Sequence, residues 1–417
     1  MPCTGHSIMV SSGDNFSLWM CAGRSEKTDV FVSRSMESSV GAEKKADPQL
    51  LEERAIKPSA LQIGKVTVDP PLILAPMAGV TDRLYRRIMA DHGAGMVTTE
   101  MVSTQGLIRD QGATWRLCAQ DDDVKVPMAV QLFGGDSRVM AEAARRLEDK
   151  GVQLIDINAG CPVKKVVKQG AGAVLLKTPD RLARMVESVK ASVSVPVTVK
   201  VRLGWDENSI NVVDAARMLE RAGVDAITVH GRTAAQFYGG QARWEWIRRV
   251  KEAVGVPVVG NGDITSPALA DAMLRQTGCD AVMIGRATQG NPWLLSAIIA
   301  GWREGTTKNP LPDWMDFQDL VEKHVNLFLG QKPQAAGHIR KIMLWYSRHC
   351  PGAAALRNEL THCTTVEAMV QLFRVWVEEL QHRGLPFMTS KVPEHRMKRE
   401  LPTENGPFNC KGLKPCR

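Results

Sequence analysis

The chain has 417 residues, 44% of them hydrophobic and 24% charged, and its formal net charge is +8. This composition excludes a wholly disordered chain, and no apolar run approaches the roughly 18 residues that a membrane-spanning helix needs. The length fits two or three domains, or one large barrel with an appendage, and the positive charge favours an anionic partner such as nucleic acid. Nine cysteines without a CxxC pair argue against a disulfide framework, so we expect a reducing, cytoplasmic compartment.

Residues 1–60 differ from the rest of the chain. They are rich in serine and mix eight acidic with seven basic residues. A secretory signal needs an apolar core after a basic start, and a transit peptide is poor in acidic residues, so neither description fits. We expect a disordered leader without a folded role.

From Leu72 onwards, short β-branched runs alternate with stretches of helical periodicity. One such stretch has apolar residues at Met140, Ala143, Ala144 and Leu147, which is the spacing of a helix with one buried face. The predicted strands are Leu72–Ala75, Met96–Thr99, Met128–Leu132, Leu154–Ile157, Val197–Val201, Ala226–Val229, Val256–Val259 and Ala281–Ile284.

The boundaries of these elements repeat. Helices are expected to end at Gly151, Gly223 and Gly278, and each of these glycines precedes an even-numbered strand. Three odd-numbered strands open with Val-Pro, and Ser266-Pro267 is typical of a helix start. Eight strands with this two-step alternation predict a (β/α)8 TIM barrel. The competing doubly wound sheet would usually place a GxGxxG loop after its first strand, where this chain has none.

Past about Trp302 the strand signals stop, and the chain predicts a small C-terminal all-helical domain. Its four predicted helices are Phe317–Leu329, His338–Cys350, Ala353–Cys363 and Val366–Gln381. The predicted organisation is a catalytic barrel at 61–305, the helical domain at 310–385 and a disordered basic tail at 386–417. Residues 330–417 hold fourteen Lys and Arg against seven Asp and Glu, so most of the net charge lies there.

In a barrel, the residues at the carboxyl ends of the strands face the active site. Reading those positions from this chain gives a mixture of amides, cations and glycines with one cysteine. They are Pro76, Met77, Ala78, Gln131, Asn158, Cys161, Lys200, Arg202, His230, Asn261, Gly262, Asp263, Gly285 and Arg286.

Glycine-rich turns at Gly262 and Gly285 follow strands seven and eight, where this architecture usually binds phosphate, and Arg286 adds a cation. With the amides of Gln131 and Asn158 and the ammonium of Lys200, such a site suits flavin mononucleotide, FMN. A lysine near the pyrimidine edge would stabilise the negative charge of the reduced ring. Lys200 alternates with two valines and is therefore expected to point into the barrel.

Cys161 lies between Gly160 and Pro162 on the rim, without an acidic neighbour in the sequence. A thiol with an ordinary pKa near 8.5 keeps its proton at neutral pH and can deliver it, so Cys161 is a candidate proton donor rather than a buried small hydrophobe. His230 is placed to donate to a phosphate or a substrate oxygen, and a structural histidine bonded to backbone is the alternative.

His349-Cys350 and His362-Cys363 lack the short paired spacing of a zinc site and fall in predicted helices, so we predict no metal site. Beside Trp345-Tyr346, the cations Arg340, Lys341 and Arg348 either face RNA or form a solvated helix face.

The motifs in this order resemble the tRNA-dihydrouridine synthase family, and most closely its bacterial B subgroup. They are APMAGVTDR (Ala75–Arg83), VQLFG (Val130–Gly134), INAGCP (Ile157–Pro162), KVRLGWD (Lys200–Asp206), VHGRT (Val229–Thr233), NGDI (Asn261–Ile264) and IGRA (Ile284–Ala287). The resemblance covers about Leu72 to Leu380, and the combination of the GCP, VHGRT and NGD motifs is specific. The family joins a flavin-bearing barrel to a helical RNA-binding domain.

The resemblance implies a flavoprotein oxidoreductase in which NADPH reduces FMN and the flavin reduces a D-loop uridine of tRNA to 5,6-dihydrouridine. Cys161 would then protonate C5 of the uracil. It also implies FMN contacts at Pro76, Met77, Ala78, Gln131, Lys200, Asn261, Gly262, Asp263, Gly285 and Arg286, with His230 carried over from related subgroups. Asn158 and Arg202 are similar to active-site residues for uracil or flavin, and we assign Arg340, Lys341 and Arg348 to RNA. The target base must leave its stack, which is easiest in a loop.

Two other functional classes remain open. A free-pyrimidine oxidoreductase related to dihydroorotate dehydrogenase shares the FMN barrel and a rim cysteine, but a small substrate needs no basic helical domain. An RNA-binding module with a vestigial barrel would not need Cys161, Lys200 and the phosphate turns. We expect a monomeric enzyme with tRNA and NADPH as partners and no membrane contact.

Overall fold

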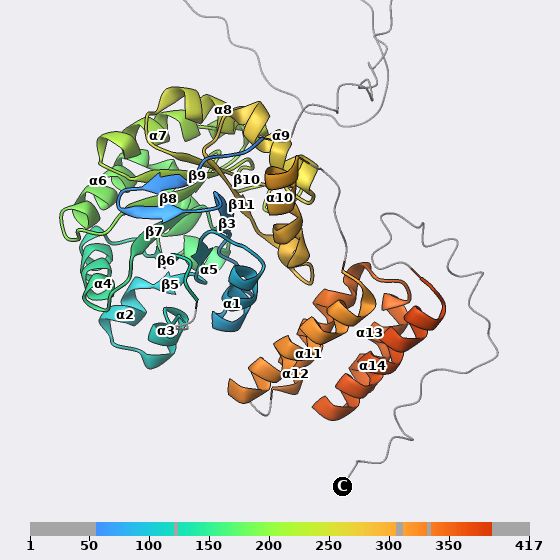
Figure 1. The fold of residues 1–417 in the computed structure, drawn as a ribbon. Coiled ribbons are helices and arrows are strands. Elements are labelled where there is room, and N and C mark those ends of the chain that lie inside the picture. Colours follow the sequence, from blue (N-terminus) through green and yellow to red (C-terminus); the bar gives the residue numbers. More distant parts are fainter. Residues whose placement is uncertain (1–55, 121–123, 306–311, 332–334, 386–417) are drawn as a thin grey trace, which may run out of the picture. The chain divides into compact units, whose positions relative to one another are not determined.

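The computed structural model describes residues 56–120, 124–305, 312–331 and 335–385 (Figure 1). The predicted tail at 386–417 lies outside these residues, as does the predicted leader up to residue 55. In the described part of the chain, no helix is long and apolar enough to cross a membrane.

Eight parallel strands form a closed barrel, which confirms the predicted fold class. They are β3 (Leu72–Leu74), β4 (Val97–Thr98), β6 (Met128–Phe133), β7 (Leu154–Ala159), β8 (Val197–Arg202), β9 (Ala226–His230), β10 (Val258–Asn261) and β11 (Ala281–Ile284). Strand β11 pairs with β3, and a parallel bridge between Ile73 and Met96 joins β3 to the start of β4. A short strand β5 (Val102–Ser103) pairs with β6 outside this path.

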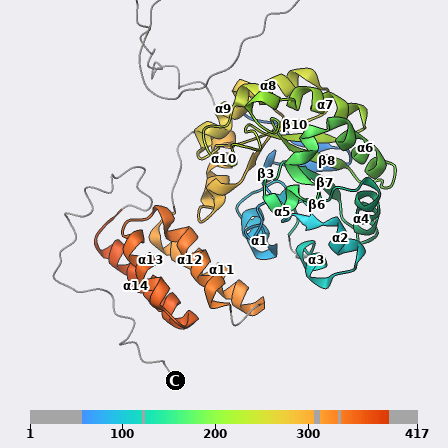
Figure 2. The same cartoon turned by 180° about the vertical axis from the view of Figure 1, so that it is seen from behind.

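Helices surround the strands in both views (Figures 1 and 2). They are α1 (Arg83–Asp91), α2 (Thr104–Ile108), α3 (Gly112–Leu117), α4 (Ser137–Asp149), α5 (Lys164–Val167), α6 (Pro179–Lys190), α7 (Val212–Arg221), α8 (Trp244–Ala253), α9 (Pro267–Thr277) and α10 (Trp293–Glu304). The predicted apolar stripe of α4 is fully buried, as the helical period requires.

Element boundaries follow local chemistry in most places. Gly278 ends α9 in the left-handed region at φ 66°, and Ser266 accepts a hydrogen bond from the Leu269 N–H at its start, as predicted. The strand predicted at Val256–Val259 begins two residues later and runs to Asn261. Pro257 has no N–H, so it joins the ladder only through its carbonyl, which accepts from Ile227 N at 2.9 Å.

An unpredicted hairpin closes the amino end of the barrel. Strands β1 (Leu61–Ile63) and β2 (Val66–Val68) are antiparallel, and the first and last residue of each is buried. These side chains pack in one apolar cluster with Leu154, Ala226 and Ala281, the first residues of β7, β9 and β11. The opposite, carboxyl end is therefore the one available for chemistry.

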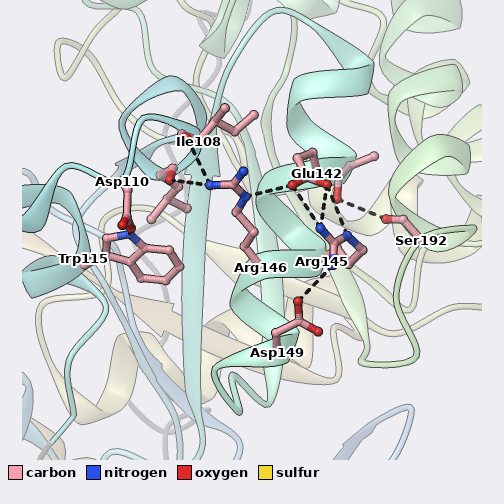
Figure 3. A network of polar contacts seen from close by, with 10 residues as sticks. Ile108, Asp110, Trp115, Glu142, Arg145, Arg146, Asp149 and Ser192 are labelled. Atoms are coloured by element: carbon pink, nitrogen blue, oxygen red, sulfur yellow. Dashed lines mark hydrogen bonds and ion pairs between the residues drawn. The ribbon is translucent and has the colours of Figure 1, made fainter.

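An arginine of α4 holds the end of α2 in place (Figure 3). Arg146 donates to the carbonyl of Ile108 at 3.0 Å and to Glu142 at 2.8 Å, and Arg145 shares that carboxylate. Exposed ion pairs of this kind contribute only about 0–1 kcal/mol each. The stability of this side of the barrel therefore comes mainly from the apolar face of α4.

Within the described residues, four helices follow the barrel, as predicted: α11 (Trp314–Gln331), α12 (Ala336–Tyr346), α13 (Ala353–His362) and α14 (Val366–His382). Helix α12 is shorter than predicted because the chain tightens into a 3-10 turn at Ser347–His349. Aromatic contacts join this region to α10 and α1: the Trp293 ring centroid lies 6.0 Å from that of Phe317, and Tyr85 lies 6.1 Å from Trp345. The two regions therefore share one apolar core.

Candidate active site

The predicted barrel-site residues come together at the carboxyl end of the strands. Gln131, Asn158, Lys200, Arg202, His230 and Asn261 lie within β6 to β10, and the others follow β3, β7, β10 and β11 directly. Because all eight strands are parallel, these positions share one rim, as the sequence predicted.

The amides of Gln131 and Asn158 belong to a buried hydrogen-bond chain. Asn158 Nδ2 donates to Gln131 Oε1 at 2.8 Å, and Gln131 Nε2 donates to Asp156 Oδ2 at 2.7 Å. Asn158 Oδ1 accepts from the backbone N–H groups of Gly160 and Cys161 at 3.2 and 2.9 Å. Asp156 was not among the predicted site residues, although strand alternation places it on the same face as Asn158.

Lys200 projects from β8 across the barrel, where its Nζ donates to Asn261 Oδ1 at 2.9 Å. Asn261 is held in turn by a 2.8 Å hydrogen bond to the carbonyl of Met283. Burial, and then the charge of Arg202, lower the pKa of Lys200 to about 7, although Asp156 opposes this. The ammonium therefore loses its proton near neutral pH unless an anion binds beside it.

Arg202 supports the turn that carries Cys161. Its side chain is buried and donates to the carbonyls of Gly160 at 2.8 Å and Phe237 at 2.7 Å. Burial raises the pKa of the Cys161 thiol above its ordinary value, and Arg202 only partly offsets this. The thiol therefore holds its proton at neutral pH, as the sequence analysis expected.

His230 ends β9 and is buried beside Gly262. Burial, followed by the charges of Lys200 and Arg202, keeps the pKa of His230 well below its usual value, so the ring is neutral. Gly262 has a φ of 125°, and a Cβ there would lie 2.7 Å from the Cβ of Ala242 and 3.1 Å from His230. Only glycine fits this turn. Gly262 is buried, and its carbonyl accepts a hydrogen bond from Trp244 Nε1 at 3.0 Å.

The carboxylate of Asp263 is committed to a protein partner. Arg232 Nη2 donates to both carboxylate oxygens at 2.8 Å, and the N–H of Ala242 donates at 2.7 Å. Arg232, which belongs to the VHGRT motif, was not among the predicted site residues. Any contact of Asp263 with a cofactor must accommodate this pair.

Arg286 lies at the open side of the site. Its side chain is 50% exposed, and its guanidinium carbon lies 4.4 Å from the ring centroid of Tyr238. Nη2 is 4.0 Å from Asp263, so this ion pair is long and leaves the guanidinium accessible to an anion.

The turn after β11 is tied to the turn after β3 and to α1. A Cβ at Gly285 would lie 3.6 Å from Met77 Sδ, which brings these two predicted cofactor turns together. The hydroxyl of Thr288 donates to the carbonyl of Gly285 at 2.8 Å and bonds the Tyr85 hydroxyl at 2.8 Å. Tyr85 was not predicted to take part in the site.

The three cations assigned to RNA have different surroundings. Arg340 donates to the carbonyls of Leu360 and Cys363 at 2.7 and 2.8 Å, so it caps the end of α13. Lys341 donates to the carbonyl of Gly79 at 2.7 Å, in the loop after β3. Arg348 is exposed. No group of three or more His, Cys, Asp or Glu side chains suited to a metal occurs among the residues described.

A family model for dihydrouridine synthases matches residues 73–381, and the chain belongs to this family. It is 41% identical over 331 residues to tRNA-dihydrouridine synthase B of Pseudomonas aeruginosa, covering 78% of this chain and 98% of that protein. It is likewise 41% identical over 316 residues to a probable tRNA-dihydrouridine synthase of Rhodobacter capsulatus, covering 75% of this chain and 97% of that protein. The matched region spans both the barrel and the C-terminal helices.

Proposed function

We propose that this protein reduces the C5=C6 bond of a uridine in the D-loop of tRNA to 5,6-dihydrouridine, with FMN as cofactor and NADPH as electron source. The observation that carries the proposal is the single rim on which the protonated thiol of Cys161, the cation Lys200 and the amide of Gln131 converge. Membership of the dihydrouridine synthase family supports the substrate class.

The residues present fit FMN. Basic side chains outnumber acidic ones in the site, which favours a phosphate. The basic ones are Lys200, Arg202, Arg232 and Arg286, and the acidic ones are Asp156 and Asp263. The turn at Gly262 has no room for a Cβ, so its backbone can pack closely against a neighbouring group. When bound, FMN supplies a two-electron carrier between NADPH and the uracil ring.

The chain's own side chains have separate roles. Arg286 and the backbone turns at Gly262 and Gly285 bind the phosphate, and Gln131 binds the pyrimidine edge through its remaining donor and acceptor capacity. Lys200 places positive charge beside that edge and favours its anionic form. This role is consistent with a pKa of about 7, because an adjacent anion holds the proton on the ammonium.

Cys161 delivers the proton. Reduction at C6 of uracil leaves negative charge on the C5 side, which the C4 carbonyl delocalises, and the thiol protonates C5. The raised pKa of Cys161 keeps the donor form populated at neutral pH. Asn158 and Arg202 bind the N–H and the carbonyl of the same Gly160–Cys161 peptide group, so the turn that carries the sulfur is held at the rim.

The basic C-terminal region binds the tRNA backbone. Residues 330–417 carry a twofold excess of basic over acidic residues, and Arg348 is exposed there. Contacts to phosphate should make tRNA affinity fall steeply as salt rises. Because Trp293 and Phe317 pack against each other, deleting the helices would expose barrel core, and point substitutions are the better test of this region.

The deciding experiment is nucleoside mass spectrometry of an unmodified tRNA transcript after incubation with the full chain, FMN and NADPH. We expect a nucleoside heavier than uridine by two hydrogens, and its loss with Cys161→Ala. No such product in the presence of both cofactors would contradict the proposal. Equal reduction of free uridine without tRNA would instead indicate a free-pyrimidine oxidoreductase.

A further inference from the structure

A buried carboxylate lies below the candidate active site, and the reaction proposed above gives it no role. Asp156 of β7 is 4% exposed and lies two residues before Asn158. In the sheet it is paired in register with Gln131 of β6 on one side and Thr198 of β8 on the other. Neighbours in register share a face, so these side chains meet inside the barrel.

The hydrogen bonds that lead to Asp156 can run in one direction only. The backbone N–H groups of Gly160 and Cys161 are donors, so Asn158 must turn its oxygen towards them. Its Nδ2 then faces Gln131, whose Oε1 accepts at 2.8 Å. This leaves Gln131 Nε2 on the other side, where it needs an acceptor and finds Asp156 Oδ2 at 2.7 Å.

Asp156 can accept from Gln131 in either protonation state. The hydroxyl of Thr198 donates to Oδ1 at 2.6 Å, and a hydroxyl can also accept a hydrogen bond. Burial raises the pKa of Asp156, while its bonds from Gln131 and Thr198 and the charge of Lys200 favour ionisation. If the carboxyl takes up a proton on Oδ1, Oδ2 still serves as the acceptor.

We propose that Asp156 is a positioning residue, which ends a one-way hydrogen-bond chain that orients the Gln131 amide and holds the turn carrying Cys161. The chain of hydrogen bonds thereby fixes the orientation of the Gln131 amide, which is fully buried and keeps one hydrogen on Nε2 and one lone pair on Oε1 outside these bonds. The cofactor part of this inference rests on the proposed function, whereas the chain from Asp156 to Cys161 does not.

The test compares Asp156→Leu, which removes the acceptor and keeps the same heavy-atom branching, with Asp156→Asn, which keeps an oxygen for Gln131 and can donate to Thr198. Thr198→Val is the matched control, because it removes a hydrogen bond to Asp156 that does not belong to the series from Asp156 through Gln131 and Asn158 to the Cys161 turn. The first readout is hydrogen exchange of the Gly160 and Cys161 amides in the full chain without cofactor or tRNA. The second is FMN affinity by fluorescence titration.

Asp156→Leu should accelerate exchange at Gly160 and Cys161 by about 5- to 150-fold, because it leaves a buried donor without a partner. It should also weaken FMN binding, while Asp156→Asn and Thr198→Val stay within about threefold of the parent. Parent-like exchange in Asp156→Leu would overturn the inference. So would equal acceleration in Asp156→Asn or Thr198→Val, since the effect would then arise from charge or general loosening.

If Asp156→Leu does not fold, Gln131→Leu interrupts the same chain one step nearer to Cys161. It should accelerate exchange at Gly160 and Cys161 by a similar factor, and parent-like exchange would again overturn the inference. The exchange readout also separates the two proposals. If hydrogen exchange changes as expected but neither the parent nor any variant binds FMN, the proposed function fails and the positioning role of Asp156 stands.

Discussion

Replacing Cys161 by alanine should separate the two halves of the proposed reaction. Flavin reduction by NADPH needs no proton from this side chain, whereas reduction of uridine needs one at C5. The pKa of Cys161 is raised by burial, so the parent enzyme carries the proton at neutral pH and above. Because the pKa is raised, the thiol loses its proton only at higher pH. The rate of uridine reduction should therefore decrease only at alkaline pH.

The structure indicates that this substitution is local. The turn is held by Asn158 Oδ1 on the Cys161 N–H at 2.9 Å and by Arg202 on the Gly160 carbonyl at 2.8 Å, and neither bond uses sulfur. General acid catalysis contributes about 10²–10⁴-fold, equivalent to roughly 3–5 kcal/mol of barrier. The uridine step should slow by about that factor, while flavin reduction and FMN content stay within a few-fold of the parent.

The assay is anaerobic stopped-flow absorbance of the flavin in the full-length protein. One experiment mixes oxidised protein with NADPH, and the other mixes NADPH-reduced protein with unmodified tRNA. Cys161→Ser is the matched control: its hydroxyl is a much weaker acid than a thiol, so it should restore little of the lost rate.

Two results would refute the reasoning. If reduced Cys161→Ala reacts with tRNA as fast as the parent, the thiol is a packing residue and the proton comes from another group or from solvent. If both half-reactions slow together, the substitution has disturbed the FMN site. The turn then does not keep its structure without the Cys161 sulfur, contrary to our expectation.

Lys200→Met should raise the melting temperature most at pH 7 and progressively less towards pH 10. The unfolded chain binds more protons in that range, because burial lowers the folded pKa of Lys200 from 10.5 to about 7; an equal gain at both pH values would contradict this. Tyr85→Phe should cost about 0.5–1.5 kcal/mol of stability and weaken FMN retention by loosening Thr288, measured by chemical denaturation and FMN titration. Arg286→Ala should weaken FMN binding by about 1.5–3 kcal/mol, and unchanged affinity would place the phosphate elsewhere. Arg348→Ala should lower tRNA affinity. It should also reduce the slope of log affinity against log salt concentration by about 1, and an unchanged slope would show that Arg348 does not contact tRNA phosphate.

Local sequence patterns determined most of the scaffold. Short β-branched runs located the eight barrel strands, and a 3.6-residue apolar spacing located the helices that cover them, because it shows which face of each helix is buried. Gly278 and Ser266 marked helix ends through their own backbone and side-chain preferences. The positions after the strands followed from the barrel geometry, which brings every carboxyl end to one rim.

Tertiary structure decided which partner each polar side chain takes. In the sequence, Asp156 is an acidic residue within an apolar run. The register of β6, β7 and β8 in the folded barrel places it beside Gln131 and Thr198. Arg340 caps α13, and Asp263 pairs with Arg232, through contacts that no local spacing encodes. Such partners lie 20 to 31 residues apart in the sequence and meet only when the chain folds. Because an unpaired buried polar group is costly, these distant contacts rather than the motifs alone fix the direction of each hydrogen bond in the site.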